Sequence, residues 1–240
     1  DIRTPMNAIV GFSQLMLRHY NNPDKVRNYS EKIVVSSQHL LSLINDVLDM
    51  SKIESGKTTL NLCDVNLADI INETDNIIRP QAKKKNQTFV VKSDGVEYCC
   101  ITADKLRLSQ ILINILSNAV KYTEEGGNIT FEIKEIKVTN PQIVKYKFII
   151  SDNGIGMSEE YLKDIFKPFT REETSLTDAV QGTGLGMAIT KNLIDLMGGT
   201  IKVLSTQGVG TTYEVTMEFR IADINTNKDL WNRYNIPKHE

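Results

Sequence analysis

The sequence has few of the features that mark secreted, metal-binding or membrane-spanning proteins. Only three of its 240 residues are cysteines (Cys63, Cys99 and Cys100), and no further Cys or His lies near them at metal-ligand spacing. We therefore expect reduced thiols, as in a cytosolic protein, and no disulfide framework. No apolar run approaches the ~20 residues that span a bilayer, and we expect no signal peptide.

Charge of one sign is not in excess either. The chain has 28 Lys and Arg residues against 30 Asp and Glu residues, a formal net charge of -2. A nucleic-acid partner would favour a basic face, so we expect none. Hydrophobic residues make up 40% of the 240 residues, which is enough for one good-sized domain or for a small domain and a medium one.

Residues 1–57 have the pattern of two helices without a strand. The segment 21–24 interrupts the apolar periodicity, and Gly56 follows the second helix where a C-cap is expected. A helical hairpin has too little core to be stable alone. We expect it to form a four-helix bundle as a dimer, and packing against its own C-terminal domain is the alternative. The residues that recur at helical spacing are Ile2, Met6, Ile9, Val10, Ser13 and Leu17, followed by Ile33, Ser37, Leu40, Leu41, Ile44, Val47, Leu48 and Ser51.

From residue 60 the pattern alternates between strands and helices. Within an α+β fold, it predicts a two-layer α/β sandwich with a mixed sheet over residues 60–222. The tail, residues 223–240, is polar and is predicted to be a linker, with Trp231 as its only candidate for docking. The expected strands are 60–65, 88–91, 98–101, 129–138, 144–151, 200–205 and 211–219, and the expected helices are 67–84, 104–122 and 184–197.

The first motif is Asn-Ile-Leu-Ser-Asn-Ala-Val-Lys-Tyr at residues 114–122. Asn114 and Asn118 lie one helical turn apart, so both carboxamides share one face, and Lys121 brings a charge beside them. A neutral Asn oxygen can hold Mg²⁺, which keeps most of its waters and binds mainly to phosphates. An Asn pair alone is also a common surface feature, so this motif does not define a site by itself.

Three glycine-rich segments follow. Residues 152–157, Asp-Asn-Gly-Ile-Gly-Met, come directly after an apolar strand and are also compatible with a simple turn. Residues 182–187, Gly-Thr-Gly-Leu-Gly-Met, open a helix, whose N-terminal N–H groups attract anions. They match neither a Walker loop nor a Rossmann fingerprint. Residues 208–212, Gly-Val-Gly-Thr-Thr, lie between two strands and fit a hairpin turn.

In this order the four segments resemble the N box and the three glycine boxes of the Bergerat-type ATPase fold, and Phe166–Phe169 resembles the F box between them. The resemblance implies that Asp152 accepts a hydrogen bond from the adenine amino group and that Asn118 ligates the Mg²⁺ bridging the phosphates. It also implies that residues 158–181 form a mobile lid over ATP, from which Arg171 is a candidate to reach a phosphate. The nucleotide-binding residues that it implies are Asn114, Asn118, Lys121, Tyr122, Asp152, Gly154, Gly156, Met157, Gly182, Thr183, Gly184, Leu185, Gly186 and Thr212.

Several classes of Bergerat ATPase hydrolyse ATP. Gyrase, the heat-shock chaperone ATPases and the mismatch-repair ATPases carry a water-activating Glu four residues before the Mg-binding Asn. In this sequence that position is Asn114. A site without this base should hold ATP for another acceptor, which favours phosphoryl transfer over hydrolysis.

The N-terminus resembles the H box of sensor histidine kinases. Residues 1–9, Asp-Ile-Arg-Thr-Pro-Met-Asn-Ala-Ile, fit the pattern His-Glu/Asp-x-x-Thr/Asn-Pro from its second position onward, and residues 49–57 resemble the end of the second hairpin helix in that family. In this register the phospho-accepting His immediately precedes Asp1, so we expect the chain to be a fragment. The resemblance implies that Asp1 takes a proton from that His and that Thr4 orients the water that dephosphorylates a partner regulator.

The resemblance as a whole implies ATP-dependent autophosphorylation on His, transfer to the receiver Asp of a response regulator, and phosphatase activity towards that regulator. ATP and Mg²⁺ are the implied cofactors, and a homodimer through residues 1–57 is the implied assembly. His19 and His39 lack the flanking acid and Thr-Pro and are predicted to be ordinary helix residues. The chain alone should therefore bind Mg-ATP without forming phosphohistidine.

We expect this kinase core to be the cytoplasmic portion of a membrane-anchored bacterial sensor, with no direct membrane contact of its own. Two other functions stay open: a nucleotide-hydrolysing machine of the chaperone type, and a non-catalytic scaffold that only dimerises and docks regulators. The stimulus, the regulator, cis or trans phosphorylation, and the presence of a receiver domain after residue 240 are left open as well.

Overall fold

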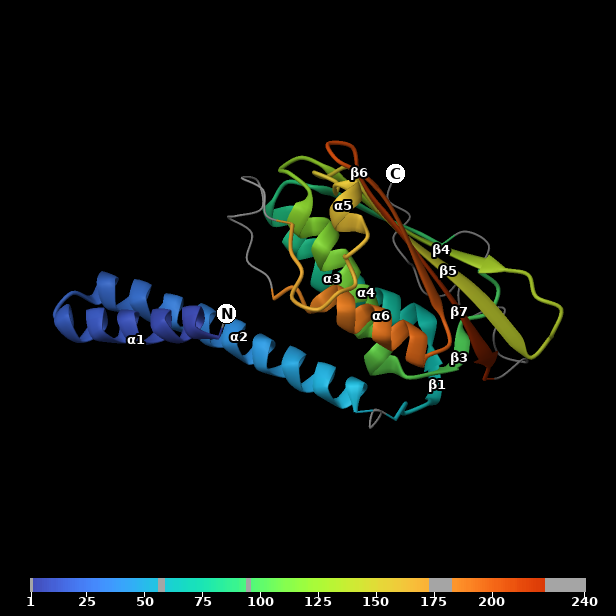
Figure 1. The fold of residues 1–240 in the computed structure, drawn as a ribbon, viewed down its shortest axis with the longest axis horizontal. Coiled ribbons are helices and arrows are strands. Elements are labelled where there is room, and N and C mark those ends of the chain that lie inside the picture. The colour runs from blue at the N-terminus through green and yellow to red at the C-terminus, as the bar shows by residue number, and fades with distance from the viewer. Residues whose placement is uncertain (1, 56–58, 94–95, 173–182, 223–240) are drawn as a thin grey trace. The chain divides into compact units, whose positions relative to one another are not determined.

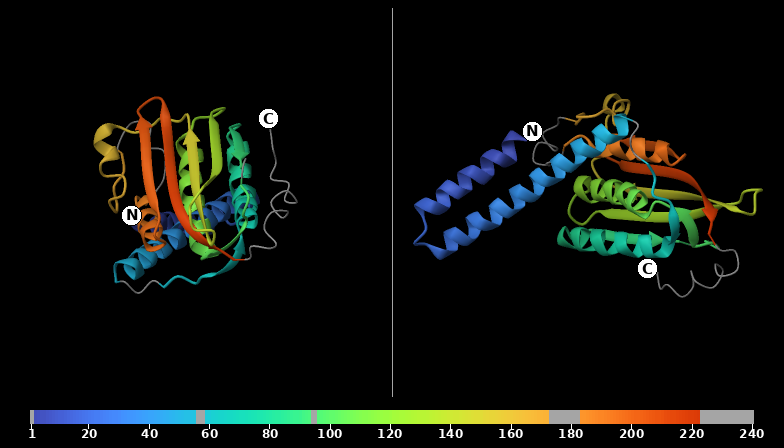
Figure 2. Two further views of the ribbon diagram at one scale, coloured as in Figure 1. Left: turned by 90° about the vertical axis from the view of Figure 1, so that its right-hand side faces the viewer. Right: turned by 90° about the horizontal axis from the view of Figure 1, so that it is seen from below.

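The computed structural model describes residues 2–55, 59–93, 96–172 and 183–222 of the chain. The chain divides into two compact units, residues 1–58 and residues 59–240 (Figure 1, Figure 2).

The first unit is a hairpin of two helices. They are α1 (Arg3–Arg18) and α2 (Pro23–Glu54). In the turn between them the Asn22 side chain accepts a hydrogen bond from the Lys25 N–H (3.1 Å). Pro23 begins α2, where its missing N–H leaves no helical bond unmade. The predicted break at residues 21–24 is therefore confirmed, whereas Gly56 lies outside the described residues.

The hairpin fully buries very few of its apolar side chains. Among its described side chains only Pro5 and Leu43 are buried. A hairpin with so little buried surface is marginal alone, because helices in proteins are stabilised mainly by packing of an apolar face. The large exposed hydrophobic residues are Ile2, Met6, Val10, Leu17, Tyr20, Val34, Val35, Leu41, Ile44, Val47 and Leu48.

The second unit is a β-sheet with helices α3, α4 and α6 on one face (Figure 1, Figure 2). Its elements in chain order are β1 (Cys63–Asn66), α3 (Leu67–Lys84), β2 (Thr88–Lys92), β3 (Cys100–Ala103), α4 (Lys105–Tyr122), β4 (Asn128–Ile136), β5 (Ile143–Asp152), α5 (Glu159–Leu162), α6 (Gly186–Leu196), β6 (Thr200–Thr206) and β7 (Gly210–Ile221).

The sheet is mixed, as predicted. Its strand order is β1-β3-β7-β5-β4-β2, and β6 also pairs with β7. Only the β2–β4 pair is parallel among the described strands. In the long antiparallel pair of β5 and β7, Asp152 lies opposite Thr211 and Ser151 lies opposite Thr212. This register brings two of the glycine-rich segments to the same end of the sheet.

The core lies between the sheet and the helices. Every second residue of β5 up to Ile150, and every second residue of β7, is buried, as expected for strands with one covered face. Full burial of one large apolar side chain contributes about 1.5–3 kcal/mol, so this interface holds the two layers together. The predicted two-layer sandwich is confirmed. The buried residues of α4 are Leu108, Ile111, Leu112, Ile115, Leu116, Ala119 and Val120.

Side-chain caps set the starts of α3 and α4. Asn66 Oδ1 accepts a hydrogen bond from the Ala68 N–H (2.9 Å). Asp104 Oδ1 accepts from the Arg107 N–H (3.0 Å), while its Oδ2 accepts from the Asn61 N–H (2.9 Å). Such caps satisfy N–H groups that have no partner within the helix. α4 therefore begins directly after Asp104.

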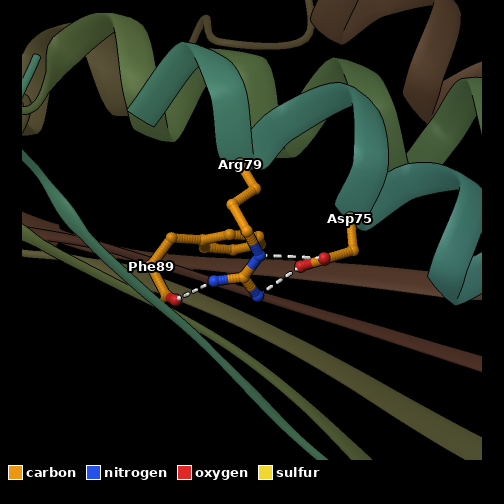
Figure 3. Close-up of polar contacts among 3 residues, drawn as sticks. All are labelled: Asp75, Arg79 and Phe89. Atoms are coloured by element: carbon orange, nitrogen blue, oxygen red, sulfur yellow. Dashed lines mark hydrogen bonds and ion pairs between the residues drawn. The ribbon is translucent and has the colours of Figure 1, made fainter. Parts of the chain in front are cut away.

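Arg79 ties α3 to the edge strand β2 (Figure 3). Its guanidinium donates two hydrogen bonds to the Asp75 carboxylate (2.9 and 2.6 Å) and one to the Phe89 carbonyl (3.2 Å). The guanidinium carbon also lies 5.4 Å from the centroid of the Phe89 ring, within the range of a cation–π contact.

Four elements start later than predicted. β1 begins at Cys63 rather than at residue 60, and α4 begins at Lys105 rather than at residue 104. β3 begins at Cys100 because Tyr98 is bonded to side chains instead: its N–H donates to the Glu135 carboxylate (3.2 Å), and its carbonyl accepts from the Tyr146 hydroxyl. α6 begins two residues after Gly184, whose φ of +70° does not fit a helix.

The short helix α5 lies in a polar stretch for which no element was predicted. Ser158 caps it by accepting a hydrogen bond from the Tyr161 N–H (3.2 Å). None of the three cysteines forms a disulfide. In the described part of the chain no three His, Cys, Asp or Glu side chains gather as a metal site, and no helix is both long and apolar enough to cross a bilayer. Trp231 lies outside the described residues.

Candidate functional site

Asp152, at the end of β5, has one carboxylate oxygen committed to the protein and one uncommitted. Its Oδ1 accepts hydrogen bonds from the N–H groups of Gly154 (2.9 Å) and Thr211 (3.3 Å). Its Oδ2 has no hydrogen-bond partner among the described residues. Burial raises the pKa of this carboxyl group, and the two N–H bonds partly oppose that shift. The site therefore offers a fixed acceptor in a partly desolvated position.

The glycines after Asp152 allow the loop to pack against neighbouring backbone. A Cβ on Gly154 would lie 2.4 Å from the Tyr122 carbonyl oxygen, and one on Gly156 would lie 2.0 Å from the Thr206 carbonyl oxygen. The Ile155 N–H donates to that same Tyr122 carbonyl (3.1 Å). Both glycines thus join the loop to the end of α4 and to the β6–β7 turn. Half-buried Met157 follows them.

Of the two asparagines in the motif on α4, only Asn114 has described hydrogen-bond partners for its side chain. Asn114 Nδ2 donates to the Thr190 hydroxyl (3.3 Å) and lies 3.5 Å from the Gly186 carbonyl oxygen, so it links α4 to α6. Asn118, one turn later and half-buried, has no side-chain partner in the described part of the chain. Its carboxamide oxygen is therefore available to a ligand.

Lys121 is a half-buried cation without a described carboxylate partner. Burial, together with the positive charges of Arg171 and Lys85, lowers the pKa of its ammonium group to about 8. Its Nζ lies 4.8 Å from the centroid of the Tyr122 ring. Burial also raises the pKa of the Tyr122 hydroxyl. A half-buried ammonium group that other cations act on, and that has no described carboxylate partner, favours an anionic ligand.

The N-terminus of α6 is held by the segment before it. Gly184 has a positive φ, and its carbonyl accepts the Phe169 N–H (3.0 Å). The Thr183 hydroxyl accepts the Leu185 N–H (3.0 Å). A Cβ on Gly186 would meet no described atom within 4 Å. The first N–H groups of a helix and the helix dipole favour anions.

Of the remaining predicted site residues, only Thr212 lies beside the groups described above. Thr212 shares a hydrogen bond with Ser151 (2.9 Å between hydroxyl oxygens), beside the Asp152 end of β5. Gly182 and Asp1 lie outside the described residues. Thr4 is exposed on α1, in the other compact unit.

The predicted lid is described only as far as residue 172. Tyr161, which the sequence did not single out, lies in this stretch, on α5. Burial and the neighbouring Tyr122 and Glu172 raise the pKa of its hydroxyl, while Arg171 opposes that shift. These influences place Tyr161 and Arg171 at the same site as Tyr122. A tyrosine in a polar segment without periodicity gives no sequence signal of such a role.

The described groups fit a magnesium nucleotide. An acceptor oxygen, a free carboxamide oxygen, an unpaired ammonium group and a helix N-terminus come together around α4, β5 and α6. Mg²⁺ prefers oxygen ligands and retains waters when it binds through phosphates. A single Asn oxygen suits that mode.

Two family models match the chain. The model described as "Histidine kinase-, DNA gyrase B-, and HSP90-like ATPase" matches residues 103–221. The model described as "His Kinase A (phospho-acceptor) domain" matches residues 1–56. The first match includes the nucleotide-type site, and the second includes the hairpin.

Individual proteins are similar over most of the chain. The autoinducer 2 sensor kinase/phosphatase LuxQ of Vibrio vulnificus is 35% identical over 218 residues, which are 90% of this chain and 25% of LuxQ. Full-length ShkA in complex with AMPPNP has a TM-score of 0.68 at 27% identity and covers 92% of this chain and 44% of ShkA. Histidine kinase ThkA, in a complex with the response regulator TrrA, has a TM-score of 0.64 at 25% identity, over 90% of this chain and 58% of ThkA. The chain spans about a quarter of the length of the curated relatives it matches.

Proposed function

Because the chain belongs to the sensor histidine kinase family, we propose that it is a kinase core that uses Mg-ATP to phosphorylate a histidine and then passes the phosphoryl group to a response-regulator aspartate. The observation that carries this proposal is Asn114. It stands in a nucleotide-type site where hydrolases of this fold have a carboxylate, and a phospho-acceptor hairpin is present in the same chain.

Asp152 is the proposed adenine-recognition residue. Its Oδ1 is already held by two backbone N–H groups, which leaves Oδ2 to accept a hydrogen bond from the adenine amino group. A buried acceptor discriminates strongly, because a ligand without the matching donor leaves it unsatisfied. Thr212 lies beside this end of β5, and Tyr122 lies on the adjoining end of α4.

Asn118, Lys121 and the N-terminus of α6 are the proposed phosphate side of the site. When bound, Mg²⁺ would neutralise phosphate charge, and the free Asn118 oxygen would contribute one of its ligands. Lys121 would supply the anion with a cation that no described acid already neutralises. The N-terminus of α6, which begins at Gly186, suits contact between phosphate oxygens and backbone N–H groups.

Asn114 favours transfer to a protein acceptor over transfer to water. Its amide is committed to holding α6 against α4 through Thr190. It carries no basic oxygen able to take a proton from water near neutral pH. ATP bound in this way should persist until a nucleophile from the hairpin reaches it, since phosphoryl transfer depends mainly on positioning and charge neutralisation.

The phospho-accepting histidine is proposed to lie immediately before Asp1. The H-box pattern continues from Asp1 to Pro5. His19 instead ends α1, with its Nδ1 2.9 Å from the Leu15 carbonyl oxygen, and His39 lacks the flanking acid. In this arrangement Asp1 takes the imidazole proton. Thr4, which is exposed, orients the water that attacks the phosphorylated regulator.

The proposed assembly is a homodimer through the exposed apolar face of the hairpin. The proposed partner is a receiver domain, and ThkA, which is similar over 90% of this chain, has been solved with a response regulator. Phosphatase activity towards that regulator is proposed as well, in keeping with the name of LuxQ, a sensor kinase/phosphatase. Because the kinase needs cellular ATP, we place this core on the cytoplasmic side of a membrane-anchored sensor.

Substitution of Asp152 by Asn tests the nucleotide site. Asn keeps an oxygen for the two backbone N–H groups but places an amide donor opposite the adenine amino group. We expect the affinity for a non-hydrolysable ATP analogue with Mg²⁺, measured by calorimetry, to fall roughly tenfold or more. The melting temperature without ligand should be kept or raised, because burial disfavours the charged carboxylate. Unchanged affinity in a folded Asp152→Asn protein would refute the assignment.

A further inference from the structure

A lysine from outside the helix caps the C-terminal end of α4. The Lys85 ammonium group follows α3 and donates hydrogen bonds to the carbonyl oxygens of Val120 (2.9 Å), Lys121 (2.9 Å) and Thr123 (3.3 Å). Carbonyl groups at the end of a helix have no partner within it, and they form the negative end of the helix dipole. A cation that contacts three of these carbonyl oxygens supplies them with hydrogen bonds and also offsets the negative end of the dipole.

Gln87 caps the same end of α4. Its side chain is buried, and its Nε2 donates to the carbonyl oxygens of Val120 (3.1 Å), Thr123 (2.7 Å) and Glu124 (3.3 Å). Its Oε1 has no partner among the described residues. The end of α4 alone therefore holds the Gln87 carboxamide in place.

The first glycine-rich loop, residues 152–157, also donates a hydrogen bond to the end of α4. The Tyr122 carbonyl, between those bound by Lys85, accepts the Ile155 N–H (3.1 Å). The same turn of α4 carries the side chains of Asn118, Lys121 and Tyr122. The backbone of the turn that faces the proposed nucleotide is thus fixed by donors that are distant in sequence.

We propose that Lys85, together with Gln87, is a positioning residue for the nucleotide site, because it fixes the last turn of α4 and so aims Asn118 and Lys121 at the phosphates. This inference rests on the proposed function. Lys85 itself need not touch the nucleotide, since its ammonium group is occupied by three carbonyl oxygens. Charge-assisted hydrogen bonds of this kind are stronger than neutral ones, so their loss should loosen the turn.

The matched control is Arg79. It is also a cation on the α3 side of the domain and also donates to a backbone carbonyl, that of Phe89, but it fixes β2 rather than the end of α4 (Figure 3). Lys85→Met and Arg79→Met each remove a cation and keep most of the apolar stem. Both variants should melt at a lower temperature. Only Lys85→Met should also bind the nucleotide more weakly.

The experiment measures calorimetric affinity of the 240-residue chain for a non-hydrolysable ATP analogue with Mg²⁺, near pH 7 and well below each melting temperature. We expect Lys85→Met to bind roughly tenfold more weakly than wild type and Arg79→Met to bind as wild type does. The loss should persist in about 0.5 M salt, where charges that act from a distance are screened. A loss that disappears in salt would show a remote charge effect and overturn the inference.

Equal affinity of wild type and folded Lys85→Met would also overturn it and would reduce Lys85 to a stabilising contact. If Lys85→Met does not fold, Lys85→Leu, which also lacks a donor to the three carbonyl oxygens, is measured in its place, and unchanged affinity there has the same meaning. A wild-type chain that fails to bind the analogue contradicts the proposed function instead, so the two failures are distinguishable.

Discussion

At the scale of single residues, the nucleotide site is defined by groups that the protein leaves uncommitted. One oxygen of Asp152, the carboxamide of Asn118 and the ammonium group of Lys121 all lack described partners, although each is at least partly buried. Partly buried polar groups usually have partners. Three exceptions around the end of one helix indicate that the partner is a ligand.

The pH dependence of binding follows from Lys121. Its pKa in the ligand-free protein is lowered to about 8 by burial, by Arg171 and by Lys85. The anionic triphosphate favours the protonated form, so the pKa is higher in the complex. Affinity for Mg-ATP should therefore be constant from about pH 7 to 8 and then fall, by up to about tenfold per pH unit, as the free protein loses this proton.

Calorimetry between pH 7.5 and 9.5 checks this prediction, because phosphate groups with a pKa of about 6 no longer titrate in that range. Binding near pH 8.5 should be accompanied by proton uptake from the buffer. Lys121→Met should flatten the profile and abolish that uptake. A wild-type affinity that is unchanged up to pH 9.5 would contradict the role assigned to Lys121.

The sequence could predict residues that act at a fixed place in a motif, but not residues that act through distant backbone. Asp152 and Asn118 were predicted because each stands in a recognisable segment, and the structure leaves both of them groups for a ligand. Lys85 and Gln87 were not predicted. They bind carbonyl groups more than thirty positions away, and a donor to a backbone carbonyl requires no particular residue type at the other end.

At the scale of elements, α2 carries an apolar seam that the hairpin does not cover. Val34, Leu41 and Leu48 follow one another at intervals of seven residues, with Ile44 between the last two, and all four are exposed. This spacing is that of a coiled-coil or helix-bundle interface. Burial of each such side chain would contribute about 1.5–3 kcal/mol.

Ile44→Glu should therefore convert the proposed dimer to a monomer, because it places a charge in the centre of the seam. Sedimentation or light scattering measures the mass directly, and the affinity for Mg-ATP should be unchanged. Ser42→Glu is the control: it adds the same charge at an exposed position two residues away, on a different side of the helix. A monomeric wild type, or a dimeric Ile44→Glu protein, would count against this interface.

The elements themselves were predicted closely wherever the apolar period was long. α3 has the predicted bounds of 67–84, and α4 begins one residue after its cap. The start of β3 was wrong because Tyr98 bonds to the side chains of Glu135 and Tyr146. Helix α5 was missed because four residues are too few to show a period, and it depends on the Ser158 cap.

At the scale of the whole molecule, the chain divides the proposed chemistry between its two units. The larger unit holds the nucleotide site, and the hairpin carries the H-box residues. Phosphoryl transfer requires the reacting atoms to come within about 3–3.5 Å, so the histidine that we propose immediately before Asp1 must reach the bound nucleotide during the reaction. Because Asn114 provides no base for water, this encounter, and not hydrolysis, should consume the ATP.

The central claim is tested most directly by following the γ-phosphate of radiolabelled ATP. The 240-residue chain is compared with the same chain extended upstream to include the residue before Asp1. We predict that only the extended chain acquires a label that is labile in acid and stable in alkali, and that a receiver domain then removes this label. Equal labelling of the 240-residue chain, or steady ATP hydrolysis by both proteins without any label, would contradict the account.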